Sequence, residues 1–196
     1  LVHARSKIEA FLLEAQQAVE AEAADLVGFT STFEQNLASL ALARRLKERR
    51  PELLTAFGGA NWEGPMGRTL HQHFQFVDLV FSGEADESFP AALELISNHR
   101  LQGSSQDLDF SNVPGLVFRH PDGTSASTGP ANPIHSMDAL PIPDYTPYFN
   151  ERATSSSAQE VPPVLLFEAS RGCWWGAKSH CTFCGLNGHS MGYRSK

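Results

Sequence analysis

Residues 53–61 read LLTAFGGAN, an apolar run that ends in two glycines, an alanine and an asparagine. Such a run is typical of a buried strand leading into a tight loop, because glycine lets the backbone turn or approach a ligand closely. The pattern recurs on both sides, as ADLVGFTSTF at 24–33 and FVDLVFSGEA at 76–85. We therefore predict three strands, whose carboxyl ends are Thr30-Ser31-Thr32, Gly58-Gly59-Ala60-Asn61 and Gly83-Glu84.

Segments with helical periodicity separate these strands, at residues 5–24, 36–50, 66–74 and 87–98. The alternating order predicts an α/β fold: a parallel, Rossmann-like sheet with helices on both faces. Ligands bind such sheets at the carboxyl ends of the strands. Because all three predicted ends carry small residues, we expect them to form one ligand-binding edge.

The pattern changes after about residue 100. The stretch GLVFRHPDGTSASTG, 115–129, predicts a hairpin, and residues 130–163 are rich in Pro, Ser and Asn, as is typical of a linker. VLLFEASRGC, 164–173, is again strand-like and places Cys173 at a strand end. We therefore divide the chain into three parts: an α/β domain over 1–100, a hairpin and linker over 101–163, and the start of a second domain over 164–196.

Composition narrows the possible partners of the 196-residue chain. Its net charge of −7 argues against nucleic acid, which requires a basic face. No apolar run approaches the ~20 residues of a membrane helix. The first residues resemble an amphipathic helix and not a signal peptide. We expect a cytoplasmic protein with neither a nucleic-acid nor a membrane partner.

Cysteines occur only as Cys173, Cys181 and Cys184. An odd, clustered set is a poor disulfide framework and a good set of metal ligands. Three thiolates can hold three irons of a 4Fe–4S cluster and leave the fourth iron open. The neighbouring aromatic residues fit either a cofactor site or a core: Phe183 against an adenine ring, and Trp174 and Trp175 as a shield from water.

Zinc is the alternative. Cys181, Cys184 and His189 have the spacing of the first three ligands of a zinc knuckle, and Arg194 stands where its last cysteine belongs. With Cys173 as fourth ligand they would form a closed Cys3His site. The cysteines favour the iron–sulfur cluster and leave the zinc site open.

The loop SRGCWWGAKSHCTFCGLNG, 170–188, resembles the cluster loop of cobalamin-dependent radical S-adenosylmethionine enzymes. It is most similar to the radical C-methyltransferases that mature ribosomally made peptides, which share a stretched cysteine spacing. Residues 27–64 and 77–95 resemble the cobalamin domain of that family. The segments VPGLVF and LPIPDY, 113–118 and 140–145, resemble its connection to the radical barrel.

This resemblance implies three cofactors: a 4Fe–4S cluster, S-adenosylmethionine and cobalamin. One S-adenosylmethionine would yield the 5′-deoxyadenosyl radical that removes hydrogen from an unactivated carbon, and a second would supply a methyl group by way of cobalamin. The implied partners are a precursor peptide as substrate and a flavodoxin or ferredoxin as reductant. The implied cofactor contacts are as follows: Cys173, Cys181 and Cys184 for the cluster, Phe183 for S-adenosylmethionine, and Thr30, Ser31, Thr32, Gly58, Gly59, Asn61, Gly83 and Glu84 for cobalamin.

The chain also departs from the family pattern. The family's first strand would precede Leu1 and most of its barrel would follow Lys196, so we expect a fragment that is inactive alone and exposes Trp174 and Trp175. The motif Asp-x-His-x-x-Gly is absent, which implies cobalamin without a histidine ligand. His71 and His73 are expected on the surface of a short helix.

Two other functions remain open. One is a radical S-adenosylmethionine enzyme of another reaction type that keeps a cobalamin-like domain. The other is a non-catalytic α/β module with a zinc site.

Overall fold

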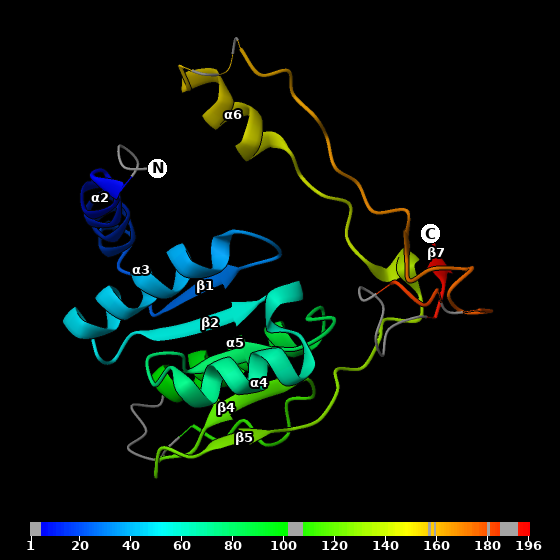
Figure 1. The fold of residues 1–196 in the computed structure, drawn as a ribbon, viewed down its shortest axis with the longest axis horizontal. Helices are drawn as coiled ribbons and strands as arrows, with labels where there is room; N and C mark the ends of the chain where they lie inside the picture. The colour runs from blue at the N-terminus through cyan, green and yellow to red at the C-terminus, as the bar shows by residue number, and fades with distance from the viewer. Residues whose placement is uncertain (1–4, 102–107, 157, 159, 180, 185–191) are drawn as a thin grey trace. The chain divides into compact units, whose positions relative to one another are not determined.

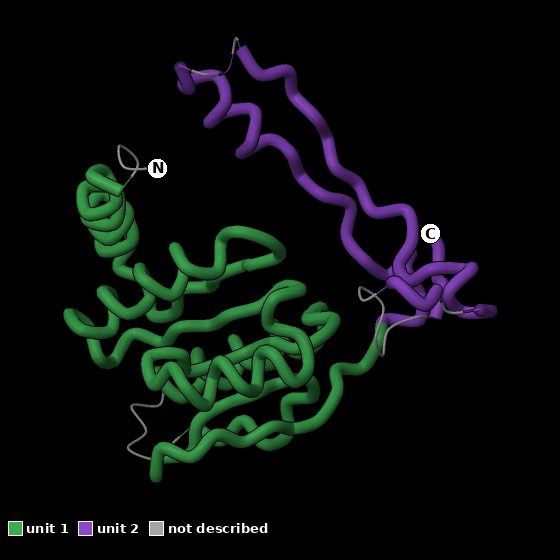
Figure 2. Tube along the Cα trace, viewed as in Figure 1, with its two compact units in different colours: residues 1–133 green, residues 134–196 purple. Residues whose placement is uncertain are grey.

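The computed structural model describes residues 5–101, 108–156, 158, 160–179, 181–184 and 192–196 (Figure 1). The chain divides into two compact units, Leu1–Pro133 and Ile134–Lys196 (Figure 2). The first unit ends beyond the boundary at residue 100 expected from the sequence, because the predicted hairpin adds its two strands to the sheet.

One five-stranded sheet forms the centre of the first unit, in the order β1-β2-β3-β4-β5. Strands β1 to β3 are parallel to one another, whereas β4 and β5 pair antiparallel. The predicted α/β fold is thus confirmed, with a hairpin added at one end of the sheet. The strand bounds are β1 Leu26–Thr30, β2 Leu54–Gly58, β3 Leu79–Phe81, β4 Leu116–Arg119 and β5 Ser125–Ser127.

Helices cover both faces of the sheet, as the sequence predicts (Figure 1). Successive strand side chains point to opposite faces, and the two apolar clusters follow that alternation. Phe57 and Val80 pack in the cluster that includes Ala43 of α3, whereas Ala56 and Leu79 pack in the cluster that includes Ile96 of α5. The helices are α2 Ile8–Ala21, α3 Gln35–Arg49, α4 Gly64–His73 and α5 Ser88–Leu101, with a 3-10 turn η1 at Ala60–Trp62.

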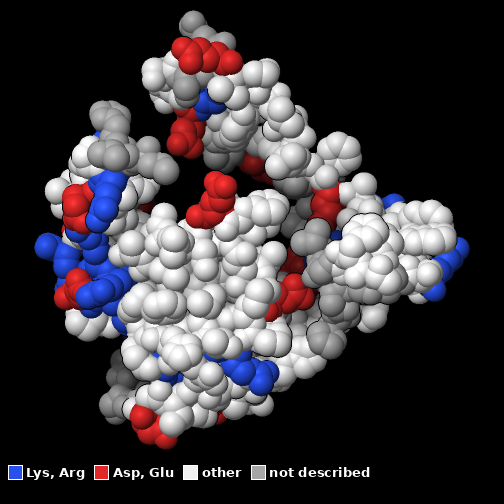
Figure 3. Space-filling view, in the orientation of Figure 1, with Lys and Arg blue, Asp and Glu red and all other residues white. Residues whose placement is uncertain are grey.

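Basic side chains gather on the C-terminal half of α3, interleaved with carboxylates (Figure 3). Two of them join α3 to α2: Arg45 pairs with Glu9, and Arg49 lies 2.9 Å from Glu20. Lys47 instead reaches Asp78, 3.0 Å away. Exposed pairs stabilise a fold only slightly, so the two pairs between α3 and α2 mainly set where α2 lies on α3.

His71 corrects the expectation that both histidines of this helix lie on the surface. His73 is exposed, but the side chain of His71 is fully buried. Its Nδ1 lies 2.7 Å from the Ser125 hydroxyl and its Nε2 3.1 Å from the Asp78 carbonyl oxygen. Both ring nitrogens thus have partners, and Ser125 is too distant in sequence for a local pattern to reveal it.

The second unit contains little regular structure. Its elements are η2 Met137–Ala139, α6 Thr146–Thr154, β6 Ser170–Arg171 and β7 Arg194–Ser195. The strand predicted over 164–173 is confirmed only at β6. Residues 164–169 have no ladder partner among the described residues, and Val164, Leu166 and Phe167 are 69%, 79% and 80% exposed. An apolar strand forms only where a sheet accepts it.

Candidate functional site

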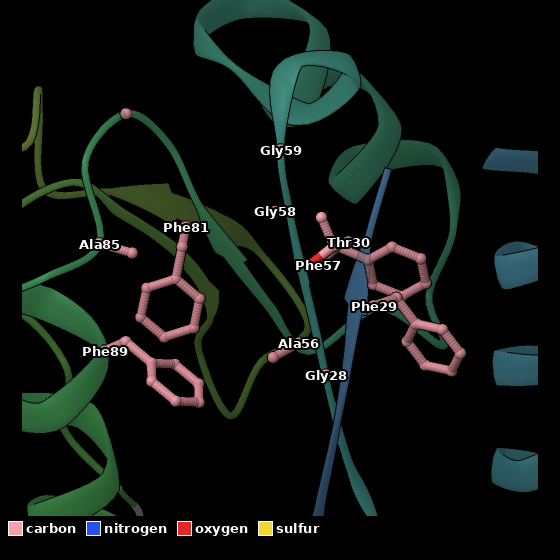
Figure 4. A pocket seen from close by; sticks show the side chains of 11 residues that line it. Gly28, Phe29, Thr30, Ala56, Phe57, Gly58, Gly59, Phe81, Ala85 and Phe89 are labelled. Atoms are coloured by element: carbon pink, nitrogen blue, oxygen red, sulfur yellow. The ribbon is translucent and has the colours of Figure 1, made fainter. Parts of the chain in front are cut away.

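A cavity of about 320 Å³ opens at the carboxyl ends of β1, β2 and β3 (Figure 4). Its size lies at the lower end of the range of roughly 300–1,000 Å³ that small-molecule sites occupy. Its lining is apolar apart from backbone groups and one hydroxyl. The described lining residues are Gly28, Phe29, Thr30, Ala56, Phe57, Gly58, Gly59, Phe81, Gly83, Ala85 and Phe89.

Four of the eight residues predicted to contact cobalamin line this cavity: Thr30, Gly58, Gly59 and Gly83. They come from all three predicted loops. The sheet therefore brings these loops to one edge, because parallel strands end on the same side.

The other four lie outside the described lining. Ser31 is fully buried and its hydroxyl accepts a 2.8 Å hydrogen bond from Asn61 Nδ2. Thr32 is exposed and its backbone N–H donates to Gln35 Oε1, 3.3 Å away. Glu84 is half-buried. Ser31 and Asn61 thus connect the loops after β1 and β2, whereas their sequence neighbours Thr30, Gly58 and Gly59 line the cavity.

Sequence reasoning missed the lining residues that lie deeper in the strands than the predicted strand ends. Gly28 and Ala56 precede the loops, and because they carry little or no side chain, one face of the sheet is left uncovered there. On the same face the Phe81 and Phe89 rings pack edge to face, with ring centroids 5.3 Å apart. Figure 4 shows these two rings on one side of β1 and β2, with Phe29 and Phe57 on the other. Small residues at alternate strand positions are a period-2 signal that was available in the sequence.

Two glycines keep the cavity open without being needed by the backbone. A β-carbon at Gly28 would have no described atom within 4 Å, and one at Gly58 would meet only the Phe81 carbonyl oxygen, at 3.7 Å. Gly59 differs, because its φ of 90° is one that other residues rarely adopt. The absence of side chains at Gly28 and Gly58 fits a ligand that approaches the sheet closely.

The cysteine loop forms two short turns. The Cys173 carbonyl oxygen accepts a 2.8 Å hydrogen bond from the Ala177 N–H. The Sγ atom of Cys173 accepts a hydrogen bond from the Gly176 N–H, with 3.3 Å between sulfur and nitrogen. In the second turn the Cys184 N–H donates to the Cys181 carbonyl oxygen, 3.1 Å away. Backbone N–H groups that donate to thiolate sulfur are typical of iron–sulfur sites.

Pairing of β6 with β7 closes this loop at its base, with Arg171 opposite Arg194. Arg194 Nη1 donates to the Ile134 carbonyl oxygen over 2.8 Å, and the Lys196 N–H donates to Ala169 over 3.0 Å. Met137 of η2, whose element contacts β7, is 1% exposed. The loop thus has an anchored base.

The three cysteines are half-buried, and they do not converge: within the described part of the chain, no three His, Cys, Asp or Glu side chains are placed to hold a metal ion. His189, the fourth ligand of the zinc alternative, lies outside the described residues. Both metal assignments therefore stay predictions. Metal ligands commonly converge only when the metal binds.

The aromatic residues of the loop face solvent. Trp174 and Trp175 are 56% and 50% exposed, which confirms the expected exposure, and Phe183 is 89% exposed. No helix in the described ranges is both long and apolar enough to span a membrane.

Solved structures similar to this fold include two of OxsB, a cobalamin-dependent S-adenosylmethionine radical enzyme. The apo form superposes with a TM-score of 0.63 at 16% identity over 94% of this chain. The form with aqua-cobalamin and S-adenosylmethionine bound gives 0.62 at 17% identity over 97%. This chain spans 23% of the length of either. No protein-family model matches the sequence, and no curated protein matches it significantly.

Proposed function

We propose that this chain is the cobalamin-binding and cluster-loop portion of a cobalamin-dependent radical S-adenosylmethionine enzyme. The observation that carries this proposal is the cavity at the strand ends, held open by Gly28 and Gly58 although the backbone does not need glycine there. The fold shared with OxsB supports it, as does the three-cysteine motif.

In this proposal the first unit binds cobalamin, which supplies a carrier for a methyl group. Thr30, Gly58, Gly59 and Gly83 offer a hydroxyl and closely accessible backbone groups. The Phe81 and Phe89 rings keep water from the inner wall of the cavity. The chain's part is thus binding, orientation and exclusion of water.

The cysteine loop of the second unit would hold the 4Fe–4S cluster. Cys173, Cys181 and Cys184 would each supply one iron ligand, which would leave one iron of the cluster available to S-adenosylmethionine. Phe183 is available to pack on the adenine ring of that cofactor, because it is exposed. An electron from a flavodoxin or ferredoxin would start the chemistry.

We further propose that the complete protein methylates an unactivated carbon of a ribosomally made precursor peptide in the cytoplasm. Support comes from the resemblance of residues 170–188 to the peptide-maturation radical C-methyltransferases. The exposed loop aromatics also leave room for further protein around the cluster.

The deciding experiment titrates this chain with aqua-cobalamin and follows the visible absorption of the corrin. We expect saturable, one-to-one binding that survives gel filtration. Iron and zinc are then determined after anaerobic reconstitution. Absence of cobalamin binding, together with tightly held zinc and no iron, would instead identify a zinc-binding α/β module.

The methyl-transfer step is tested with the complete protein and a small precursor peptide encoded beside it. We expect mass spectrometry to find one hydrogen of the peptide replaced by a methyl group. A modified peptide without an added methyl group would indicate radical chemistry of another type.

A further inference from the structure

Two loops at the cavity are hydrogen-bonded to each other. They are the loop after β1, residues 31–34, and the loop after β2, which begins at Gly59. The Ser31 N–H donates to the Gly58 carbonyl oxygen over 2.9 Å, and the Asn61 N–H donates to the Ser31 carbonyl oxygen over 3.1 Å. These two hydrogen bonds connect the backbones of the two loops.

The side chain of Asn61 adds a second layer to this connection. Its Nδ2 donates to the Ser31 hydroxyl over 2.8 Å and to the Phe33 carbonyl oxygen over 2.9 Å. A side-chain amide nitrogen carries two hydrogens, so both donors are used within the protein. Asn61 has no amide N–H left for a ligand.

Gln35 holds the same loop from its other end. Its Oε1 accepts hydrogen bonds from the N–H groups of Thr32 and Phe33, at 3.3 Å and 3.0 Å. The segment from Thr30 to Phe33 is thus fixed at two points, although Thr32 and Phe33 are exposed. Thr30, at the start of the segment, is the residue that reaches the cavity.

We infer that Asn61 is a positioning residue of the ligand site, which acts through Ser31 and Phe33 and does not touch the ligand. This inference rests on the proposed function, because it concerns the same cavity. By fixing the loop before the ligand arrives, the amide removes an ordering cost that binding would otherwise carry. An aspartate of equal size cannot replace it, because a carboxylate cannot donate to the Phe33 carbonyl oxygen.

The first test needs no ligand. Hydrogen exchange of the backbone amides of Thr32 and Phe33 is measured in the wild-type chain and in Asn61→Asp. We expect exchange to become about tenfold faster in the variant, because one of the two anchors of the loop is lost. Asn98→Asp, which makes the same chemical change at an exposed position of α5, should leave these amides unchanged.

The second test is a double-mutant cycle on cobalamin affinity with Ser31→Ala, Asn61→Ala and the double variant. If Asn61 acts through Ser31, the weaker-binding single variant should have an affinity about tenfold below wild type. The double variant should then bind no more weakly than that single variant. Additive losses would overturn the inference, because they would mean that Asn61 contacts the ligand itself. Unchanged affinity in all three variants would overturn it as well.

The two proposals fail separately. A wild-type chain that binds no cobalamin contradicts the proposed function, yet the exchange experiment still decides whether Asn61 orders the loop. Circular dichroism melting checks that each variant folds. If Asn61→Asp does not fold, Ser31→Ala is measured in its place, because it removes only the hydrogen bond between Asn61 Nδ2 and the Ser31 hydroxyl. Faster exchange is again expected, and unchanged exchange would contradict the inference.

Discussion

A β-carbon added at Gly59 would lie 2.6 Å from the carbonyl oxygen of Ser31, closer than such atoms approach in proteins. Gly59 also has a φ of 90°. We therefore expect Gly59→Ala to lower the free energy of unfolding by about 1–3 kcal/mol. Urea unfolding measures the loss. Gly58→Ala is the matched control and should change stability by less than about 1 kcal/mol. Equal stabilities for the two variants would contradict this prediction.

Filling the cavity should impair binding and leave the fold intact. In Gly28→Val the new side chain finds open space and a strand that suits a β-branched residue. We expect cobalamin affinity to fall by about tenfold or more while the melting temperature stays near that of wild type. Gly192→Val adds the same atoms where nothing lies within 4 Å, outside the cavity, and should bind normally. Normal affinity in Gly28→Val would show that the ligand binds elsewhere.

Each cysteine should be essential for the iron–sulfur cluster. After anaerobic reconstitution of the complete protein, we expect brown 4Fe–4S absorption that Cys173→Ala, Cys181→Ala and Cys184→Ala each abolish, because each removes an iron ligand. His189→Ala separates the two metal hypotheses, since a Cys3His zinc site needs this residue and the cluster does not. Iron content that falls in His189→Ala as it does in the cysteine variants would speak against the assigned ligands.

Burial of His71 should make the fold sensitive to mild acid. Desolvation, helped by the nearby Arg119 guanidinium, lowers the pKa of His71 to about 4. The unfolded chain keeps the ordinary value of 6.5, so between these values it binds a proton that the folded chain does not. Stability should therefore fall as the pH drops from 6.5 towards 4, by on the order of 3 kcal/mol in total.

The variant His71→Gln isolates this effect. It should be less stable than wild type at pH 7, because the two buried hydrogen bonds are disturbed. Its stability should depend less on pH between 6.5 and 4. Urea midpoints measured at several pH values give both slopes, and parallel slopes would show that His71 does not titrate as its burial requires.

We expect this chain alone to make no 5′-deoxyadenosine. Its loop aromatics Trp174, Trp175 and Phe183 are at least half exposed, so a radical formed there would meet solvent. The reconstituted, reduced chain is incubated with S-adenosylmethionine and analysed by chromatography beside the complete protein. Turnover at comparable rates would mean that the cysteine loop needs no further cover.

The sheet could be predicted from the sequence because each of its parallel strands is an apolar run followed by a glycine or small polar loop. Those signals are local, and the loops that the sheet brings to one edge could be recognised from local signals in the same way. The position of β4 and β5 beside β3 was not predictable in this way, because strand pairing depends on contacts between residues distant in sequence.

The site shows the same limit. Their place at the ends of predicted strands suggests that Ser31 and Asn61 face a ligand, but the Asn61 amide donates to the Ser31 hydroxyl across 30 positions of sequence. His71 was misjudged for the same reason, since its partner Ser125 lies on another element. Conversely, the sequence alone does not single out Gly28 and Ala56. A small residue within a strand borders a cavity only if its neighbours in the folded protein leave the space beside it empty.

The order of the five strands in the sheet is also their order along the chain. During synthesis each strand can therefore pair with the one made just before it, without waiting for a distant partner. Every described lining residue of the cavity precedes the middle of α5. The described residues that line the cavity are thus all synthesised before Cys173, so this cavity can form before the cysteine loop has been made.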